Sequence, residues 1–230
     1  MVDVRRVRGG SGLDEINDEL DQILDSVVEN TRNATEAFFA SYDKNPDPQI
    51  LADWLTPRAW REIDYVFLLN EQIRRYGLAF ERKHITLLAK QSFQEAEHYE
   101  MVGQAIESLG GKVPTSAPPE ARPWSEFLWE CLERHPLAAI AAWNCSETSA
   151  SGSFEPTFRA GARHGFDEVV RIYKQIETDE KFHVGLGRQV LAAYAKTDKD
   201  RDEILRAMRG MRDIAWKTFT PESVSQARAG

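Results

Sequence analysis

Two stretches of this chain carry the same Glu-x-x-His pattern: Lys90-Gln-Ser-Phe-Gln-Glu-Ala-Glu-His98 and Lys174-Gln-Ile-Glu-Thr-Asp-Glu-Lys-Phe-His183. A lone glutamate precedes each pattern at the same distance, Glu62 before Glu95 and Glu147 before Glu180. The second set therefore repeats the first at a constant offset along the chain. Four carboxylates and two imidazoles in this order are the ligands that a four-helix bundle supplies to a pair of first-row metal ions.

Helix geometry explains the spacing within each pattern. Residues three positions apart lie on one face of a helix, with Cβ atoms about 5–6 Å apart. One helix can thus offer a carboxylate that bridges two metals and an imidazole that binds one of them. Hard oxygen ligands with one imidazole per metal favour iron or manganese over zinc or copper(I). We therefore predict a cofactor of two iron ions, with manganese or a mixed manganese–iron pair as the alternatives.

Bulk composition excludes several classes of protein. The 230 residues carry a net charge of −8, which argues against nonspecific binding to nucleic acid. No apolar run approaches the roughly 18 residues that would span a membrane, and no signal-peptide pattern follows the N-terminus, so we expect a cytoplasmic protein. Cys131 and Cys145 form no CxxC pair, which disfavours a thiolate zinc site or a disulfide framework.

Helical periodicity runs through almost the whole chain, and no convincing strand pattern interrupts it. Residues 13–42 predict one or two amphipathic helices, and Thr56-Pro57 looks like the start of the next one. The further helices are expected at residues 57–76, 79–108, 124–134, 136–160, 166–195 and 199–217. We expect an N-terminal accessory segment at 1–46, a helical bundle at 47–220 and a flexible tail at 221–230.

The turns agree with the positions of the proposed ligands. Two residues of an antiparallel hairpin face each other only if they are equally far from its turn. The midpoint between Glu62 and Glu95 falls beside Gly77, and that between Glu147 and Glu180 falls within residues 161–165, which begin and end with glycine. The connection between the two hairpins is far longer than the 2–8 residues that an up-down-up-down bundle needs. It is long enough to make the second and third bundle helices parallel.

These motifs resemble the ferritin-like di-iron carboxylate superfamily, and they are most similar to the phenylacetyl-CoA oxygenase catalytic subunit and the bacterial multicomponent monooxygenases. The resemblance covers about residues 57–195. It implies an all-α, ferritin-like four-helix bundle with a long crossover between its second and third helices, plus N-terminal and C-terminal accessory helices. It also implies bridging roles for Glu95 and Glu180, terminal carboxylates from Glu62 and Glu147, and one imidazole per iron from His98 and His183.

The same resemblance points to two further catalytic residues. Asp179 matches an aspartate that orients a metal-binding histidine in those enzymes, whereas Gln94 stands at the equivalent position before Glu95. Ser151, one turn after Glu147, matches a hydroxyl near the O₂ site. Around it, residues 146–153 are small side chains apart from Glu147, which fits either a hollow that admits substrate or close helix packing. We interpret His84, His135 and His164 as surface or capping residues.

The leading functional hypothesis is a di-iron oxygenase or oxidase that uses O₂ to hydroxylate, epoxidise, desaturate or N-oxygenate a small organic substrate. Two cysteines cannot hold an iron–sulfur cluster, so electrons would come from an external donor such as a reductase or ferredoxin, or from the substrate. No nucleic-acid or membrane partner is expected, and the N-terminal helix either packs on the core or is a candidate docking or homodimer surface. The alternatives are a ferroxidase, peroxide-scavenging or iron-handling protein, and a metal-free structural bundle.

Overall fold

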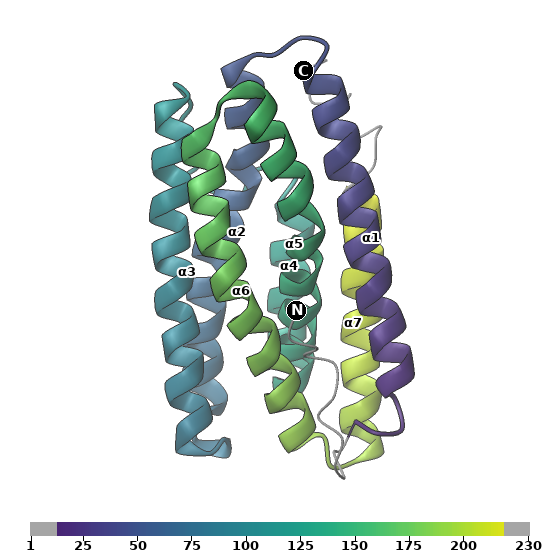
Figure 1. Ribbon diagram of the computed structural model, residues 1–230. Coiled ribbons are helices and arrows are strands. Elements are labelled where there is room, and N and C mark those ends of the chain that lie inside the picture. Colours follow the sequence, from purple (N-terminus) through teal and green to yellow (C-terminus); the bar gives the residue numbers. More distant parts are fainter. Residues whose placement is uncertain (1–12, 219–230) are drawn as a thin grey trace.

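Every regular element of the computed structural model, which describes residues 13–218, is a helix. The all-α prediction is therefore confirmed for these residues, and the predicted tail at 221–230 lies outside them. The helices, shown in Figure 1, are α1 (Asn17–Tyr42), α2 (Pro48–Tyr76), α3 (Arg82–Ser108), α4 (Arg122–Arg134), α5 (Pro136–His164), α6 (Asp167–Tyr194) and α7 (Asp198–Thr218), with a 3₁₀ turn at Gly77–Ala79. Among the described residues, no helix is both long and apolar enough to cross a membrane.

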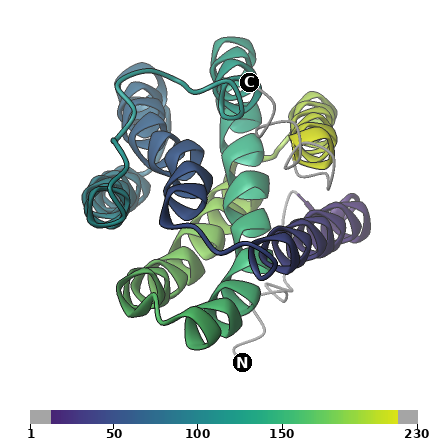
Figure 2. The same ribbon diagram turned by 90° about the horizontal axis from the view of Figure 1, so that it is seen from above.

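Helices α2, α3, α5 and α6 form the four-helix core. Helix α2 packs on α3, α5 packs on α6, and α3 lies against α6. The long connection between α3 and α5 contains α4, which packs on α5. Helices α1 and α7 pack on α5 and on each other (Figures 1 and 2), and the C-terminal part of α1 also reaches α2, where Phe38 stacks on Trp54. Helix α5 is thus surrounded by other helices, which explains why it is the most apolar of the core helices.

Helix α2 begins earlier than the sequence predicts. The expected start at Thr56-Pro57 is wrong, because the helix begins at Pro48 and continues through Pro57. Asp47 caps this start: its carboxylate accepts a hydrogen bond from the backbone N–H of Gln49 at 2.9 Å. The added turns bury Leu51 and Leu55 completely, so tertiary packing offsets the backbone hydrogen bond that Pro57 cannot make.

The turns lie where the ligand spacing places them. Gly77 opens the short turn between α2 and α3. Helix α5 ends at Gly165, whose φ of 74° is in the left-handed region that glycine adopts without strain. The two hairpins therefore align Glu62 with Glu95 and Glu147 with Glu180, in the middle of the bundle.

Two apolar clusters fill the interior on either side of this central level. On α2, Ala59 belongs to one cluster and Tyr65 to the other, with Glu62 between them. On α6, Ile176 and Leu186 are divided in the same way by the Glu-x-x-His motif. The proposed ligands thus form a polar layer between two apolar regions, and that layer needs partners for its charges.

Candidate metal centre

The structure brings all six predicted ligands into one cluster. Helix α2 supplies Glu62, α3 supplies Glu95 and His98, α5 supplies Glu147, and α6 supplies Glu180 and His183. All are buried except the half-buried Glu62. They form two groups whose candidate ligand atoms lie within 4.8 Å of one another: Glu62, Glu95 and His98, and Glu95, Glu147, Glu180 and His183.

Glu95 belongs to both groups and lies between the two histidines. Its Oε2 is 3.5 Å from Nδ1 of His98, and its Oε1 is 3.0 Å from Nδ1 of His183. The two imidazole centroids are 5.6 Å apart. This is the placement that a bridging carboxylate requires. Glu180 lies in only one of the groups, so its bridging role stays a prediction.

The far side of each imidazole contacts the residue that precedes the glutamate of the other motif. Nε2 of His98 lies 3.3 Å from Oδ2 of Asp179, and Nε2 of His183 lies 3.2 Å from Oε1 of Gln94. The Gln94 amide also donates to Asp179 at 2.7 Å. With Nε2–H donating outward, each imidazole in its neutral form would direct the Nδ1 lone pair toward the carboxylates, as a metal-binding histidine needs. Asp179 thus lies where it can orient a histidine, and Gln94 takes the matching place.

Unpartnered polar atoms test whether the cluster suits a metal. Within residues 13–218, five buried ligand atoms make no hydrogen bond: Glu95 Oε2, His98 Nδ1, Glu147 Oε1, Glu180 Oε2 and His183 Nδ1. A buried carboxylate or imidazole without a partner is costly. These atoms lie in the two groups described above, so bound cations would satisfy them together. The residues therefore fit a pair of metal ions.

The pKa values of the buried carboxyl groups Glu95, Glu147 and Glu180 are strongly shifted. Burial raises the pKa of Glu180 to about 8. Burial, with Glu180 and Glu95 close by, raises the pKa of Glu147 well above its usual value. Burial also disfavours the charged form of Glu95, but His183 and His98 outweigh it and hold the pKa of Glu95 far below its usual range. Without metal, the negative charge is concentrated on the shared glutamate.

The pKa values of His98 and His183 are raised, whereas burial alone lowers the pKa of an imidazole. Burial lowers the pKa of His98, yet its contacts with Glu62 and Glu95 outweigh this effect and raise the pKa to about 12. Burial likewise opposes charging of His183, but Glu95 produces a net rise in its pKa. The raised pKa values favour the protonated form of both imidazoles in the metal-free protein, so metal binding competes with these protons.

Metal binding should consequently release protons and weaken at low pH. Glu180, whose pKa is about 8, is increasingly protonated as the pH falls below that value, and the protonated carboxyl is a poor ligand. We expect the affinity for Mn(II) to fall about tenfold per pH unit for each proton displaced between pH 8 and 6. Titration calorimetry in two buffers of different ionisation enthalpy would count these protons. An affinity that does not change with pH would contradict this assignment of protons.

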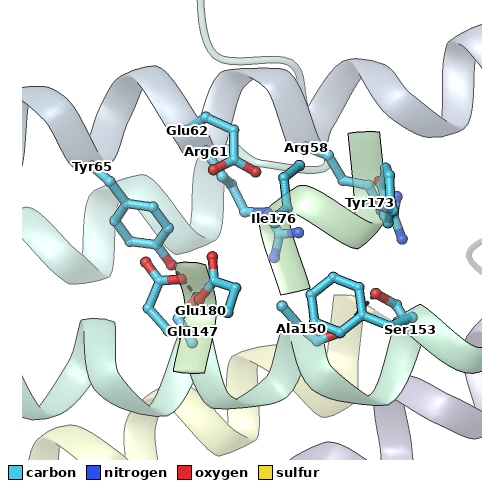
Figure 3. Close-up of a pocket in the computed structure, with 12 residues that line it drawn as sticks. Arg58, Arg61, Glu62, Tyr65, Glu147, Ala150, Ser153, Tyr173, Ile176 and Glu180 are labelled. Carbon is cyan, nitrogen blue, oxygen red and sulfur yellow. Dashed lines mark hydrogen bonds between the residues drawn. The ribbon is translucent and has the colours of Figure 1, made fainter. Parts of the chain in front are cut away.

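A pocket opens beside the cluster, as Figure 3 shows. Glu62, Glu147 and Glu180 border it, together with two arginines of α2 that the sequence analysis did not single out, Arg58 and Arg61. A signal was available, because Arg58, Glu62 and Tyr65 are spaced to share one face of the helix. The remaining lining residues are Tyr65, Ser146, Ala150, Ser153, Phe154, Tyr173 and Ile176.

Ser151 does not lie at this pocket, so the prediction that placed its hydroxyl near the metals is wrong. Its side chain is exposed, and its Oγ donates to the Thr148 carbonyl at 2.8 Å. The residue before it, Ala150, lines the pocket instead. A hydroxyl of α5 that does border the pocket belongs to Ser146, which accepts a hydrogen bond from the phenol of Tyr65. A single position along α5 turns a side chain by about 100°, which accounts for the error.

The two interpretations of the small residues at 146–153 apply to different faces of α5. Ser146, Ala150 and Ser153 border the pocket. Gly152 faces α1, where a Cβ atom would lie 2.2 Å from the Val28 carbonyl oxygen. Small side chains thus leave room for the pocket on one face of α5 and allow close packing against α1 on another face.

The other histidines have separate roles. His135 caps α5 by accepting a hydrogen bond from the backbone N–H of Leu137 at 3.2 Å. His164 lies 2.6 Å from Asp43 at the surface. His84 is buried, with Nδ1 2.8 Å from the hydroxyl of Tyr194, so its interpretation as a surface or capping residue is wrong.

Comparison with known proteins supports the fold but not a family. No protein-family profile matches this chain, and no curated protein matches it significantly. The structure is similar to a crystal structure of a domain of unknown function with a heme oxygenase-like fold from Shewanella denitrificans OS217, with a TM-score of 0.61. The match covers 94% of this chain and 93% of that one, at 13% sequence identity.

The fold and the site together define a class. The chain has an all-helical fold of the heme oxygenase-like type, consistent with the predicted four-helix bundle and its accessory helices. In the middle of that bundle lies a buried carboxylate–histidine cluster that could hold metal ions. The identity of the metal, the reaction and the subfamily are matters for proposal.

Proposed function

We propose that this protein is a non-haem di-iron enzyme that activates O₂ to oxidise a small organic substrate. The observation that carries the proposal is the convergence of six Glu and His side chains from four helices, with Glu95 common to both metal-binding groups. Four carboxylates and two imidazoles suit iron, with manganese as the alternative. The motif resemblance to the phenylacetyl-CoA oxygenase catalytic subunit and the multicomponent monooxygenases points to the same chemistry.

The pocket favours an organic substrate over iron handling. It lies directly beside Glu147 and Glu180, and it has apolar walls from Ala150, Phe154 and Ile176. A channel for iron ions would be expected to have acidic walls along its length, whereas the carboxylates among the described residues that line this pocket are the proposed ligands Glu62, Glu147 and Glu180 alone. The apolar side chains suit a hydrocarbon group. This observation ranks a ferroxidase or iron-storage role below an oxygenase.

Bound iron would supply the electrons and the Lewis acidity for O₂ activation. The chain's own residues would hold and position it: Glu95 joins the two groups, and Asp179 and Gln94 contact the far side of the imidazoles and would fix their orientation. The two apolar clusters limit the access of water from either end of the bundle.

Further electrons would come from a partner protein. Cys131 and Cys145 are both buried free thiols, and the usual iron–sulfur centres need four ligands. An external reductase or ferredoxin, a cytoplasmic location and a homodimer remain parts of the same proposal. No role in binding nucleic acid is proposed for this acidic chain.

Glu147→Ala provides the first test of the proposal. The wild-type protein should bind about two Fe(II) ions per chain under anaerobic conditions and show a rapid optical change on mixing with O₂. Removal of Glu147 deletes a carboxylate from the second group, so we expect about one iron and a loss of that optical change. Iron analysis and stopped-flow absorbance would measure both quantities.

The matched control is Glu155→Ala, which removes an exposed carboxylate from the same helix. It should behave as the wild type. Uptake of many irons per chain as oxide would instead indicate storage. Absence of iron binding in the wild type would overturn the metalloenzyme proposal and leave a structural bundle.

A further inference from the structure

Large apolar side chains are exposed on the α2–α3 hairpin. Phe67 of α2 is 51% exposed, Phe93 of α3 is 63% exposed, and Leu78 is fully exposed in the turn between the two helices. One further large apolar side chain of the described residues is exposed, Trp216 of α7. Single exposed apolar residues are common on proteins, but several on one hairpin indicate a surface that binds a partner.

Phe93 lies at the centre of the outer face of α3. This helix packs on α2, where Ser92 accepts a hydrogen bond from Asn70, and on α6, which Gln94 contacts. Figures 1 and 2 both place α3 at the edge of the bundle, so the side opposite the interior faces outward. Exposed residues follow one another along this side at alternating steps of four and three, the spacing at which one helix packs along another. They are Arg82, Thr86, Ala89, Phe93, Ala96 and Glu100.

Charges divide the outer face into a basic half and an acidic half. The exposed charged residues before Phe93 are Arg82, Lys83 and Lys90, and those after it are Glu97, Glu100 and Glu107. In a parallel pair of α3 helices, each charge would meet a like charge. In an antiparallel pair, the basic half of one helix meets the acidic half of the other. The face is thus complementary to a second copy of itself, in one direction only.

Opposite charges also lie on the same flank of the helix. Residues seven positions apart share a flank, so Lys90 and Glu97 both lie toward α6, where Nζ of Lys90 is 4.3 Å from the ring centroid of Phe182. In an antiparallel pair with Phe93 of both copies at the axis, Lys90 of one copy lies beside Glu97 of the other. Twofold symmetry forms this ion pair twice.

We infer that two copies of this chain associate through the outer faces of their α3 helices, which run antiparallel about a twofold axis at Phe93. The two phenyl rings pack against each other and between Ala89 and Ala96. Leu78 and the last residue of α3, Ser108, are equally far from Phe93 along the chain, so Leu78 of one copy comes close to the end of the other copy's α3. This interface specifies the homodimer of the proposed function, but it rests on the exposed side chains of α3 and not on bound metal.

Sedimentation velocity of the full-length protein would measure the association. One helix per protomer is a small interface, so we expect a dimer with a Kd on the order of micromolar. Phe93→Lys replaces two aromatic rings at the axis with two positive charges, and should weaken association at least ~100-fold. Trp216→Lys makes the same kind of change at an exposed apolar residue of α7, and should dimerise as the wild type does.

Charge reversal tests the paired flanks. Lys90→Glu brings two carboxylates together at each copy of the pair, so it should weaken association about tenfold. Addition of Glu97→Lys to the same chain should restore association, because each pair is then reversed and not lost. Circular dichroism would verify that the variants are folded, which we expect because both positions are exposed.

Single cysteines test the direction of the helices. A cysteine introduced by Phe93→Cys meets its own copy at the axis, and should form an intermolecular disulfide on mild oxidation. One introduced by Ala89→Cys should not, because the antiparallel arrangement separates its two copies by about 12 Å along the helix. The native Cys131 and Cys145 are buried and should not react.

Several results would overturn the inference. They are a wild type that stays monomeric at submillimolar concentration, a dimer that Phe93→Lys does not weaken, a reversed pair that does not restore association, and cross-linking of Ala89→Cys as readily as Phe93→Cys, which would indicate parallel helices. Iron analysis of the same samples would measure metal binding separately, and Phe93→Lys should bind as much iron as the wild type.

Discussion

Glu95→Ala should abolish binding of both metal ions, the largest functional effect that we expect from a single substitution. Glu95 is the one glutamate common to the two groups, and its two oxygens face the Nδ1 atoms of His98 and His183. Its removal takes a ligand from each metal and leaves two buried imidazoles without their shared anion. We expect iron to fall from about two to near zero per chain, with O₂-dependent activity reduced at least ~100-fold. Metal analysis and O₂ consumption would measure the loss.

A matched control lies two residues away. Glu97 is on the same helix, but its side chain is exposed and outside the cluster. Glu97→Ala should bind the same amount of metal as the wild type. If Glu95→Ala kept one iron per chain at wild-type affinity, the bridging role of Glu95 would be wrong, and the two groups would be independent sites.

Gly152→Ala adds only one methyl group, yet we expect it to cause a large loss of folding stability. A Cβ atom at this position would lie 2.2 Å from the Val28 carbonyl oxygen and 2.9 Å from the Arg32 nitrogen. Both are backbone atoms of α1, so the contact can be relieved only if α1 moves away from α5. Overpacking of this kind costs about 3 kcal/mol, and the higher helix propensity of alanine offsets ~1 kcal/mol. The Tm should therefore fall by roughly 4–8 °C.

Gly77→Ala is the corresponding control. A Cβ atom there would meet the Ile73 side chain at 3.4 Å, an ordinary contact, and the φ of −55° is accessible to any residue. Calorimetric unfolding of the two variants should show a decrease for Gly152→Ala alone. An unchanged Tm for Gly152→Ala would mean that α1 is not packed against α5 as described.

Local patterns predicted most of the helices, and the errors have tertiary causes. Thr56-Pro57 has the residues of a helix start, yet α2 passes through Pro57 because the preceding turns bury Leu51 and Leu55. Ser151 and Ala150 are adjacent in sequence, and only the rotation of α5 against its neighbours decides which one lines the pocket. Helix propensity contains no information about either outcome.

The contacts of the two imidazoles could be predicted even less from the sequence, because they depend on tertiary structure. Sequence similarity singled out Asp179 but not which histidine it contacts. The structure pairs Asp179 with His98 and Gln94 with His183, each across the α3–α6 interface. Because Gln94 stands where the second motif has Asp179, His183 contacts an amide, whereas His98 contacts a carboxylate. Only the packing of α3 against α6 determines which histidine each of these residues contacts.

By itself, the sequence determined the all-helical fold, the turn positions and the six candidate ligands, because each follows from spacing along one helix or about one hairpin turn. The tertiary structure alone decided that Glu95 is shared, that Arg58 and Arg61 border the pocket, and that Gly152 allows α1 to approach α5. These features depend on the relative rotation of helices far apart in sequence. That rotation is set by the packing of side chains across the whole core, which no local periodicity specifies.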